Sequence, residues 1–127
     1  RRFNQAAVLA RLVARGSGHE CIPDLLVRRR RTAPQGGFGR AARRRNVAGA
    51  FEVAARHRAA LAGRRVLLVD DLIATGGTAF AGIRLLERAG ASIVGCSFVI
   101  DLPELGGADK LRAIGKPVTS LVAFEGH

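Results

Sequence analysis

Two adjacent aspartates, Asp70 and Asp71, stand at the end of four consecutive large aliphatic residues, Val66-Leu67-Leu68-Val69. Such a run predicts a strand buried on both faces, as in a parallel sheet covered by helices. In open parallel sheets, ligands bind beyond the carboxyl ends of the strands, which is where this strand would deliver both acids. Ionised carboxylates only accept hydrogen bonds, so the pair suits either a metal ion or hydroxyl donors such as the vicinal hydroxyls of a ribose.

A glycine-rich turn follows the acids and opens the next predicted helix. Gly76 and Gly77 let backbone N–H groups approach an anion, Thr75 and Thr78 add hydroxyl donors, and a helix N-terminus carries partial positive charge. The segment therefore predicts a phosphate-binding loop. A Walker A loop is not matched, because that motif ends in Gly-Lys-Ser/Thr and no lysine precedes Lys110. A dinucleotide fingerprint is not matched either, because its acid follows the glycines, whereas here the acids precede them.

The surrounding pattern predicts strands that alternate with helices. The predicted helices are 3–15, 40–50, 78–89 and 107–114, and the predicted strands are 21–27, 51–53, 66–69, 92–100 and 118–124. Strand, loop, helix and strand between residues 66 and 100 make a βαβ unit. We therefore expect an α/β fold with a parallel sheet flanked by helices.

The net charge of +11 is concentrated in the first half of the chain. Residues 1–65 hold 16 arginines against three acids, whereas residues 66–127 have a net charge of −2. The stretch from Arg28 to Arg45 holds eight arginines and no acid, and its glycines predict a flexible Arg-rich loop over 28–46. Three interpretations stay open: a loop for nucleic acid, a loop for a polyphosphate ligand, and a solvated basic loop.

The length of 127 residues predicts one domain, 1–127. No apolar run approaches the roughly 20 residues needed to cross a bilayer, so we expect a cytoplasmic protein without a membrane partner. The two cysteines and three histidines lack the paired spacing of a zinc site. No metal ion is therefore expected to be held by direct protein ligation.

Residues 66–79, which read Val-Leu-Leu-Val-Asp-Asp-Leu-Ile-Ala-Thr-Gly-Gly-Thr-Ala, resemble the signature of the type I phosphoribosyltransferases. Enzymes of this family use 5-phosphoribosyl 1-pyrophosphate (PRPP), so 66–78 would be the PRPP motif. The resemblance implies that Asp70 and Asp71 hold the ribose 2′ and 3′ hydroxyls, and so fix C1 for catalysis. It implies that Ala74 to Thr78 bind the 5′-phosphate. It also implies Mg²⁺ as the cofactor, a parallel sheet with a small hood over the base, and, we expect, a homodimer.

The two flanks of this motif resemble different branches of the family. Residues 95–126, above all Phe98-Val99-Ile100-Asp101-Leu102-Pro103-Glu104-Leu105-Gly106-Gly107, look like the carboxyl end of adenine phosphoribosyltransferase. Ala74 agrees, because the 6-oxopurine enzymes usually have an aspartate at that position. Upstream, Phe3-Asn4-Gln5-Ala6, Pro23-Asp24-Leu25-Leu26 and Arg43-Arg44-Arg45-Asn46 resemble the ComF family of competence-associated phosphoribosyltransferase-like proteins.

The ComF likeness makes 28–46 the loop that closes over pyrophosphate, with Arg40 and Arg43 in catalysis and Arg44 and Arg45 in substrate binding. The adenine likeness implies transfer of phosphoribosyl to a purine, with adenine giving AMP and pyrophosphate. The alternative is a ComF-type protein of DNA uptake that binds ligand or nucleic acid without purine salvage. The first strand of the family fold, with its pyrophosphate loop, would precede Phe3, so we expect this chain to lack it.

Overall fold

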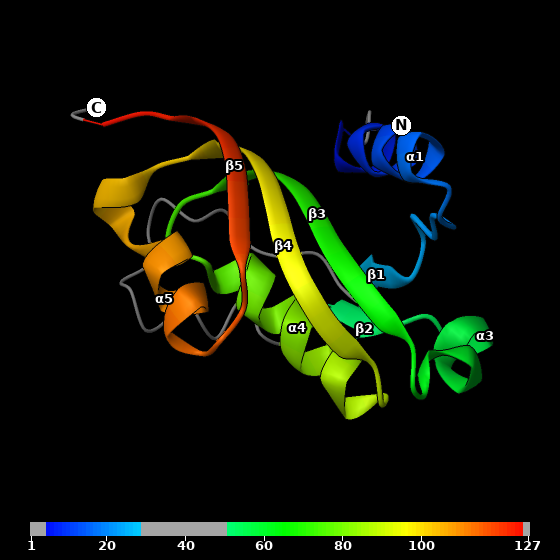
Figure 1. Cartoon of the computed structure of the whole chain (residues 1–127). Coiled ribbons are helices and arrows are strands. Elements are labelled where there is room, and N and C mark those ends of the chain that lie inside the picture. Colours follow the sequence, from blue (N-terminus) through cyan, green and yellow to red (C-terminus); the bar gives the residue numbers. More distant parts are fainter. Residues whose placement is uncertain (1–4, 29–50, 126–127) are drawn as a thin grey trace.

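The computed structural model describes residues 5–28 and 51–125. In chain order the elements are α1 (Gln5–Ser17), β1 (Leu26–Arg28), β2 (Phe51–Val53), α3 (Ala55–Arg58), the 3-10 turn η1 (Ala59–Leu61), β3 (Arg65–Ile73), α4 (Gly77–Arg88), β4 (Ser92–Asp101), the 3-10 turn η2 (Pro103–Leu105), α5 (Gly107–Ala113) and β5 (Val118–Ala123). Strands and helices alternate from β3 onward, as the sequence predicts (Figure 1). Within these ranges, no helix has both the length and the apolar character that a membrane crossing requires.

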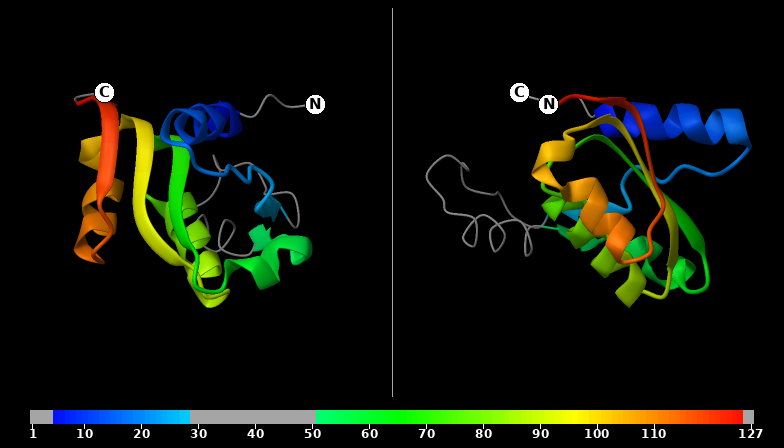
Figure 2. Two further views of the ribbon diagram at one scale, coloured as in Figure 1. Left: turned by 45° about the vertical axis from the view of Figure 1, so that its right-hand side comes forward. Right: turned by 60° about the vertical axis from the view of Figure 1, so that its left-hand side comes forward.

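The sheet that carries the acids has three parallel strands in the order β3-β4-β5. Helix α4 connects β3 to β4, and α5 connects β4 to β5, so both crossovers advance in the same direction across the sheet. Parallel crossovers are almost always right-handed, which places both helices on one face. Figure 2 shows α4 and α5 together on that side of the strands. The predicted α/β fold, with a parallel sheet flanked by helices, is confirmed.

The hydrophobic core lies between these two helices and the sheet. Ile83 and Leu86 on α4 and Leu111 on α5 are at most 1% exposed. They belong to one cluster with Ile73 of β3 and Phe98 of β4. Ile83 and Leu86 are three residues apart, so they lie on the same side of α4 and face the sheet together. The helix that begins at the glycine-rich turn is thereby fixed to the strand that carries the two acids.

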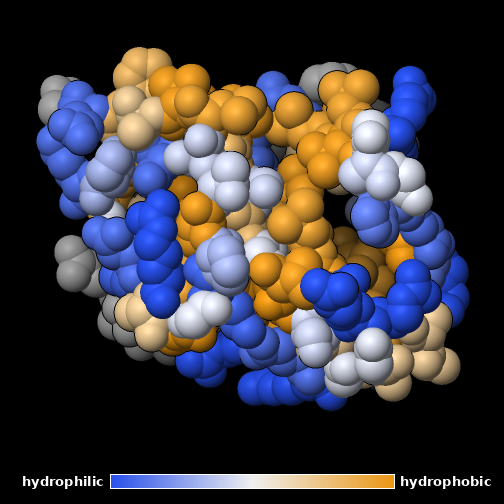
Figure 3. All heavy atoms as spheres, in the orientation of Figure 1, coloured by the Kyte–Doolittle hydropathy of each residue, from blue (hydrophilic) through white to orange (hydrophobic). Residues whose placement is uncertain are grey.

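Strand β3 is covered less completely than predicted. Leu67 is 42% exposed, so the prediction of burial on both faces is wrong. The physical reason lies in α1, which packs against β3 but buries only Ala7. A cavity of about 860 Å³ lies between α1, β3 and the segment around β1. In the space-filling view, apolar side chains surround a hollow beside α1 (Figure 3).

Strand β1 is shorter than the predicted strand 21–27. Only Leu26–Arg28 pair with β2, antiparallel, because Pro23 has no N–H for a ladder and the Leu25 N–H donates to the Ile22 carbonyl in a turn (3.3 Å). Since Arg28 belongs to β1, the predicted loop 28–46 starts one residue too early. Residues 29–50, with the rest of that loop and the predicted helix 40–50, lie outside the described residues.

Candidate functional site

The two aspartates lie inside β3 and not after it. The ladder with β4 continues past them, because Asp70 pairs with Phe98, Leu72 with Ile100 and Ile73 with Asp101. The expectation that the strand ends at residue 69 is therefore corrected. Ile73 is the last residue of the strand, so both acids still lie near its carboxyl end, at the edge of the sheet where the glycine-rich turn begins.

The two carboxyl groups interact, and their surroundings favour a proton on Asp70. Burial raises the pKa of the Asp70 carboxyl from its usual 3.8 to about 6. A side-chain hydrogen bond with Asp71 and the charge of Asp71 also raise it, whereas the hydrogen bond that the Asp71 backbone N–H donates to Asp70 Oδ1 (2.8 Å) opposes them. The structure thus brings the predicted acid pair together. Near neutral pH the pair is an acceptor for hydroxyl groups.

The turn after β3 has the geometry of an anion-binding loop. Gly76 precedes α4 with φ +92°, a left-handed conformation that favours glycine. The first turn of a helix leaves its N–H groups without intrahelical acceptors, and among the described residues no side chain caps them at Gly76. That turn also contains no acidic residue, so nothing in it offsets the partial positive charge of the helix end.

The side chains around this turn leave room for a ligand. Thr75 and Thr78 are exposed, so both hydroxyls are available as donors. A Cβ added at Gly77 would meet no atom of residues 5–28 or 51–125 within 4 Å, so these parts of the chain leave space beside the first helical residue. Ala74, half-buried, joins this turn to the strand. The structure therefore places all five predicted residues, 74–78, around one uncapped helix N-terminus.

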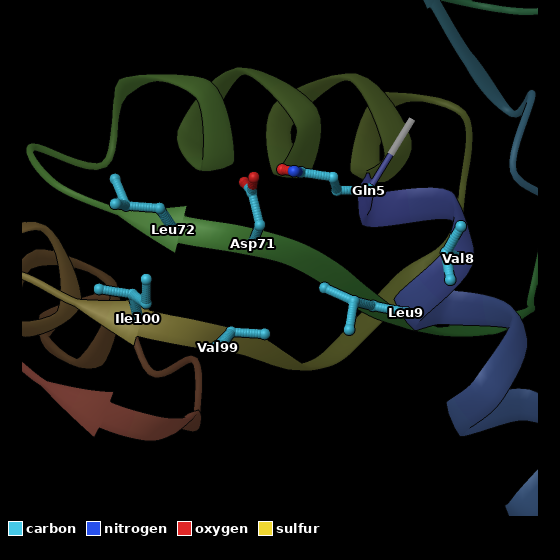
Figure 4. A pocket seen from close by; sticks show the side chains of 7 residues that line it. All are labelled: Gln5, Val8, Leu9, Asp71, Leu72, Val99 and Ile100. Carbon is cyan, nitrogen blue, oxygen red and sulfur yellow. The ribbon is translucent and has the colours of Figure 1, made fainter. Parts of the chain in front are cut away.

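A pocket of about 400 Å³ adjoins Asp71. Its walls come from α1, β3 and β4, and the residues lining it are Gln5, Val8, Leu9, Asp71, Leu72, Val99 and Ile100. Figure 4 shows the Gln5 amide and the Asp71 carboxylate extending toward the same space, with apolar side chains around them. An apolar hollow with a few polar groups is the usual composition of a small-molecule site. The sequence predicts a helix over 3–15 but assigns it no part in the site, because nothing in the local pattern shows that this helix lies against the end of β3.

Two further residues lie at this edge of the sheet, and neither was assigned a role in the site from the sequence. Asp101, the last residue of β4, is only 6% exposed, and among the described residues its Oδ1 has no hydrogen-bond partner. Gly107 begins α5 and donates its backbone N–H to the Ala74 carbonyl (2.9 Å). The place of these two residues in the site could not be predicted from the local sequence pattern, because each contacts residues about 30 positions away in the chain.

The four arginines predicted for pyrophosphate, Arg40, Arg43, Arg44 and Arg45, lie outside the described residues. The residues that flank this segment, Arg28 and Phe51, are partners in the β1–β2 pair. Among the described residues, no group of three or more His, Cys, Asp or Glu side chains could hold a metal ion. The Asp70–Asp71 pair alone could contribute carboxylate oxygens to a cation that a ligand also holds, which is how Mg²⁺ commonly binds.

Known proteins resemble about half of this chain closely. Over 64 residues, 50% of the chain, it is 72% identical to the adenine phosphoribosyltransferase of Maricaulis maris (strain MCS10), and the match spans 37% of that relative. Over 65 residues, 51% of the chain, it is 69% identical to the adenine phosphoribosyltransferase of Rhodopseudomonas palustris (strain TIE-1), spanning 36% of that relative. The matched part is thus little more than a third of the length of these relatives.

Among solved structures, adenine phosphoribosyltransferase from Rhodothermus marinus DSM 4252 aligns at 52% identity with a TM-score of 0.46. That alignment covers 50% of this chain and 35% of the other. The sequence model of the phosphoribosyl transferase domain family matches residues 5–117 of this chain. These residues include α1, the acid pair, the glycine-rich turn and α5. By this match over most of its length, the chain belongs to the phosphoribosyltransferase domain family.

Proposed function

We propose that this chain transfers the phosphoribosyl group of PRPP to a purine, with adenine as the preferred base and AMP and pyrophosphate as products. The observation that carries the proposal is the continuous unit of β3, turn and α4, in which an interacting acid pair is followed by an uncapped helix N-terminus. The names of the adenine phosphoribosyltransferase relatives support the choice of base.

In this proposal the sugar and its phosphate are held by separate groups. Asp70 and Asp71 accept hydrogen bonds from the ribose 2′ and 3′ hydroxyls. The backbone N–H groups at the start of α4, with the hydroxyls of Thr75 and Thr78, bind the 5′-phosphate. Each hydrogen bond to a charged phosphate contributes about 1.5 to 3 kcal/mol, so three or four of them dominate the affinity. Held at both ends, the ribose presents C1 in one orientation.

The reaction breaks the bond between C1 and the pyrophosphate oxygen, forms a bond between C1 and a purine nitrogen, and releases the proton of that nitrogen to the pyrophosphate or to solvent. Charge on the departing pyrophosphate grows as the first bond breaks, and we assign its stabilisation to Arg40 and Arg43, with Arg44 and Arg45 binding the substrate. Mg²⁺, bound with PRPP, would shield part of the same charge. No side-chain nucleophile is needed, because the base itself attacks C1.

The glycine-rich turn of residues 74–78, here called the phosphate cradle, gives the sharpest test of this proposal at Gly77. Calorimetric titration of the unmodified chain with PRPP and Mg²⁺ should show binding, and Gly77→Val should abolish it by filling the space that the phosphate needs. The matched control is Gly16→Val on α1, because a Cβ at Gly16 also meets no atom within 4 Å. Unchanged PRPP affinity in the Gly77 variant would contradict the cradle assignment. Steady-state assays with adenine, hypoxanthine and guanine then identify the base.

The second candidate is a ComF-type role, with the Arg-rich half on nucleic acid. The observation that favours it is the charge of residues 1–65, which hold 16 arginines and only three acids. Changing Arg43 and Arg44 to Ala separates the two proposals. Weaker pyrophosphate binding supports the transferase, whereas loss of duplex DNA affinity with unchanged pyrophosphate binding supports the second role. We further propose that the transferase works in the cytoplasm. We also propose that it forms a homodimer, and analytical ultracentrifugation of the purified chain would test this oligomeric state.

A further inference from the structure

The segment that follows β4 returns to the turn that follows β3. The Leu102 N–H donates to the Ile73 carbonyl (3.0 Å), and the Gly107 N–H donates to the Ala74 carbonyl (2.9 Å). These two backbone hydrogen bonds join segments about 30 residues apart, and they lie on either side of the point where β3 becomes the glycine-rich turn. The position of the turn is therefore determined partly by residues of the later segment.

Gly107 lies so close to the turn that no side chain fits between them. A Cβ at Gly107 would lie 2.5 Å from the Ala74 carbonyl oxygen, 2.7 Å from the Gly76 nitrogen and 2.9 Å from Ile73 Cγ1. The first two of these are backbone atoms, which cannot rotate away as a side chain can. To reach an ordinary contact of 3.4 Å, the turn and the start of α5 would have to separate by about 0.9 Å.

The approach is reciprocal. A Cβ at Gly76 would lie 3.2 Å from Gly107 Cα and 3.4 Å from the Gly107 carbonyl oxygen. Gly76 also has φ +92°, a left-handed conformation that favours glycine, so a side chain at this position would strain the backbone as well as crowd Gly107. Two glycine backbones thus pack directly on each other. The one in the turn precedes the uncapped N–H groups of α4, and the other fixes where that turn can lie.

We propose that Gly107 is a positioning residue for the 5′-phosphate of the substrate. It touches no ligand; it holds Ala74 and Gly76 where the N–H groups at the start of α4 point at the phosphate. Hydrogen bonds from N–H groups to oxygen occupy a narrow range of about 2.7 to 3.2 Å, so a displacement of the turn by several tenths of an ångström breaks or weakens them. This inference rests on the proposed function, because it deepens the assignment of the same phosphate cradle.

The test is binding of ribose 5-phosphate, by calorimetry, to three forms of the chain. Gly107→Ala should weaken binding about tenfold or more, the equivalent of losing one charge-assisted hydrogen bond. The matched control is Gly95→Ala on β4, where the added Cβ meets its nearest atom at an ordinary 3.5 Å; its affinity should stay within about twofold of the unmodified chain. Thermal unfolding shows that each variant is folded.

A kinetic measurement separates positioning from a general loss of structure. In the Gly107→Ala variant the KM for PRPP should rise, whereas the KM for adenine at saturating PRPP should stay close to that of the unmodified chain. If Gly107→Ala does not fold, Gly106→Ala takes its place. Gly106 has φ +81° and its Cβ would meet no atom within 4 Å, so alanine there strains the backbone beside Gly107 without touching the turn. A rise of at least threefold in the dissociation constant of ribose 5-phosphate is then expected.

Two outcomes overturn the inference. One contradicts the positioning role alone, and the other also contradicts the assignment of the phosphate site. Unchanged ribose 5-phosphate affinity in a folded Gly107→Ala variant, or in Gly106→Ala where that variant is used, overturns the positioning role alone. Failure of the unmodified chain to bind ribose 5-phosphate overturns the phosphate cradle itself, and the positioning role with it. An equal rise of both KM values would show that Gly107 is only structural.

Discussion

Ribose recognition by this chain should depend on pH through Asp70. Burial raises the pKa of this carboxyl to about 6, so at about pH 7.5 it is roughly 97% ionised and at about pH 5 only roughly 9% ionised. A protonated carboxyl is a poorer acceptor for a ribose hydroxyl than a carboxylate. The part of the affinity that depends on the ribose hydroxyls should therefore fall about tenfold between these two pH values.

The assay must remove the titration of the ligand, because a phosphate monoester also has a pKa near 6. We would measure dissociation constants for ribose 5-phosphate and for tetrahydrofurfuryl phosphate, which carries the phosphate but no vicinal hydroxyls. The ratio of the two constants reports the hydroxyl contribution alone. In Asp70→Asn this ratio should be independent of pH, because an amide does not titrate. A ratio that is also flat in the unmodified chain would refute the assignment of Asp70 to ribose.

The same pKa predicts how stability depends on pH. The folded-state pKa of Asp70 lies above its usual value of 3.8, so protonation favours the folded chain. This contribution is fully present below about pH 3.8 and is lost as the pH rises through about 6. Asp70→Asn should therefore raise the melting temperature at neutral pH, and less so at pH 4. A variant less stable than the unmodified chain at pH 7 would contradict this reasoning.

Three further predictions concern the base, the core and Asp101. Ala74→Asp should shift preference from adenine toward hypoxanthine and guanine or abolish turnover, and equal kcat/KM for all three bases in the unmodified chain would show that the adenine assignment is wrong. Leu111→Ala removes a side chain that is 0% exposed and should cost about 2 to 5 kcal/mol in denaturant unfolding. A smaller loss would mean that α5 relaxes into the space. Asp101→Leu should raise the free energy of unfolding by about 1 to 3 kcal/mol, because it replaces a buried side chain whose Oδ1 has no hydrogen-bond partner among the described residues with an apolar one of similar size; a decrease would reveal a partner for the carboxyl group.

The parts of the fold that follow from local pattern were predictable. The residue types around Val66, Gly76 and Ile83 encode a strand, a turn and an amphipathic helix within 20 positions, and all three form in that order, although the strand continues to Ile73. The exposure of Leu67 was not predictable, because it depends on how closely α1, which is remote in sequence, packs against β3.

The same distinction applies to the site. The acid pair and the turn are contiguous in sequence, so their chemistry can be read from residue types. Gly107 reads only as the start of a helix, because its contact with Ala74 and Gly76 arises from the crossover that brings α5 back to the sheet edge. The raised pKa of Asp70 comes mainly from burial of its carboxyl group, and burial depends on the whole fold and not on the neighbouring residues in sequence.

The loose attachment of α1 has a consequence for native-state dynamics. Only Ala7 of its 13 residues is buried, whereas α4 buries four of its 12. Elements with few buried contacts open at lower free energy than the rest of a domain, so backbone amides of α1 should exchange with deuterium faster than those of α4. Because Gln5, Val8 and Leu9 form one wall of the pocket beside Asp71, that wall belongs to an element that opens more readily than α4. The pocket can therefore change shape by local unfolding while the acid pair and the turn stay fixed on the core.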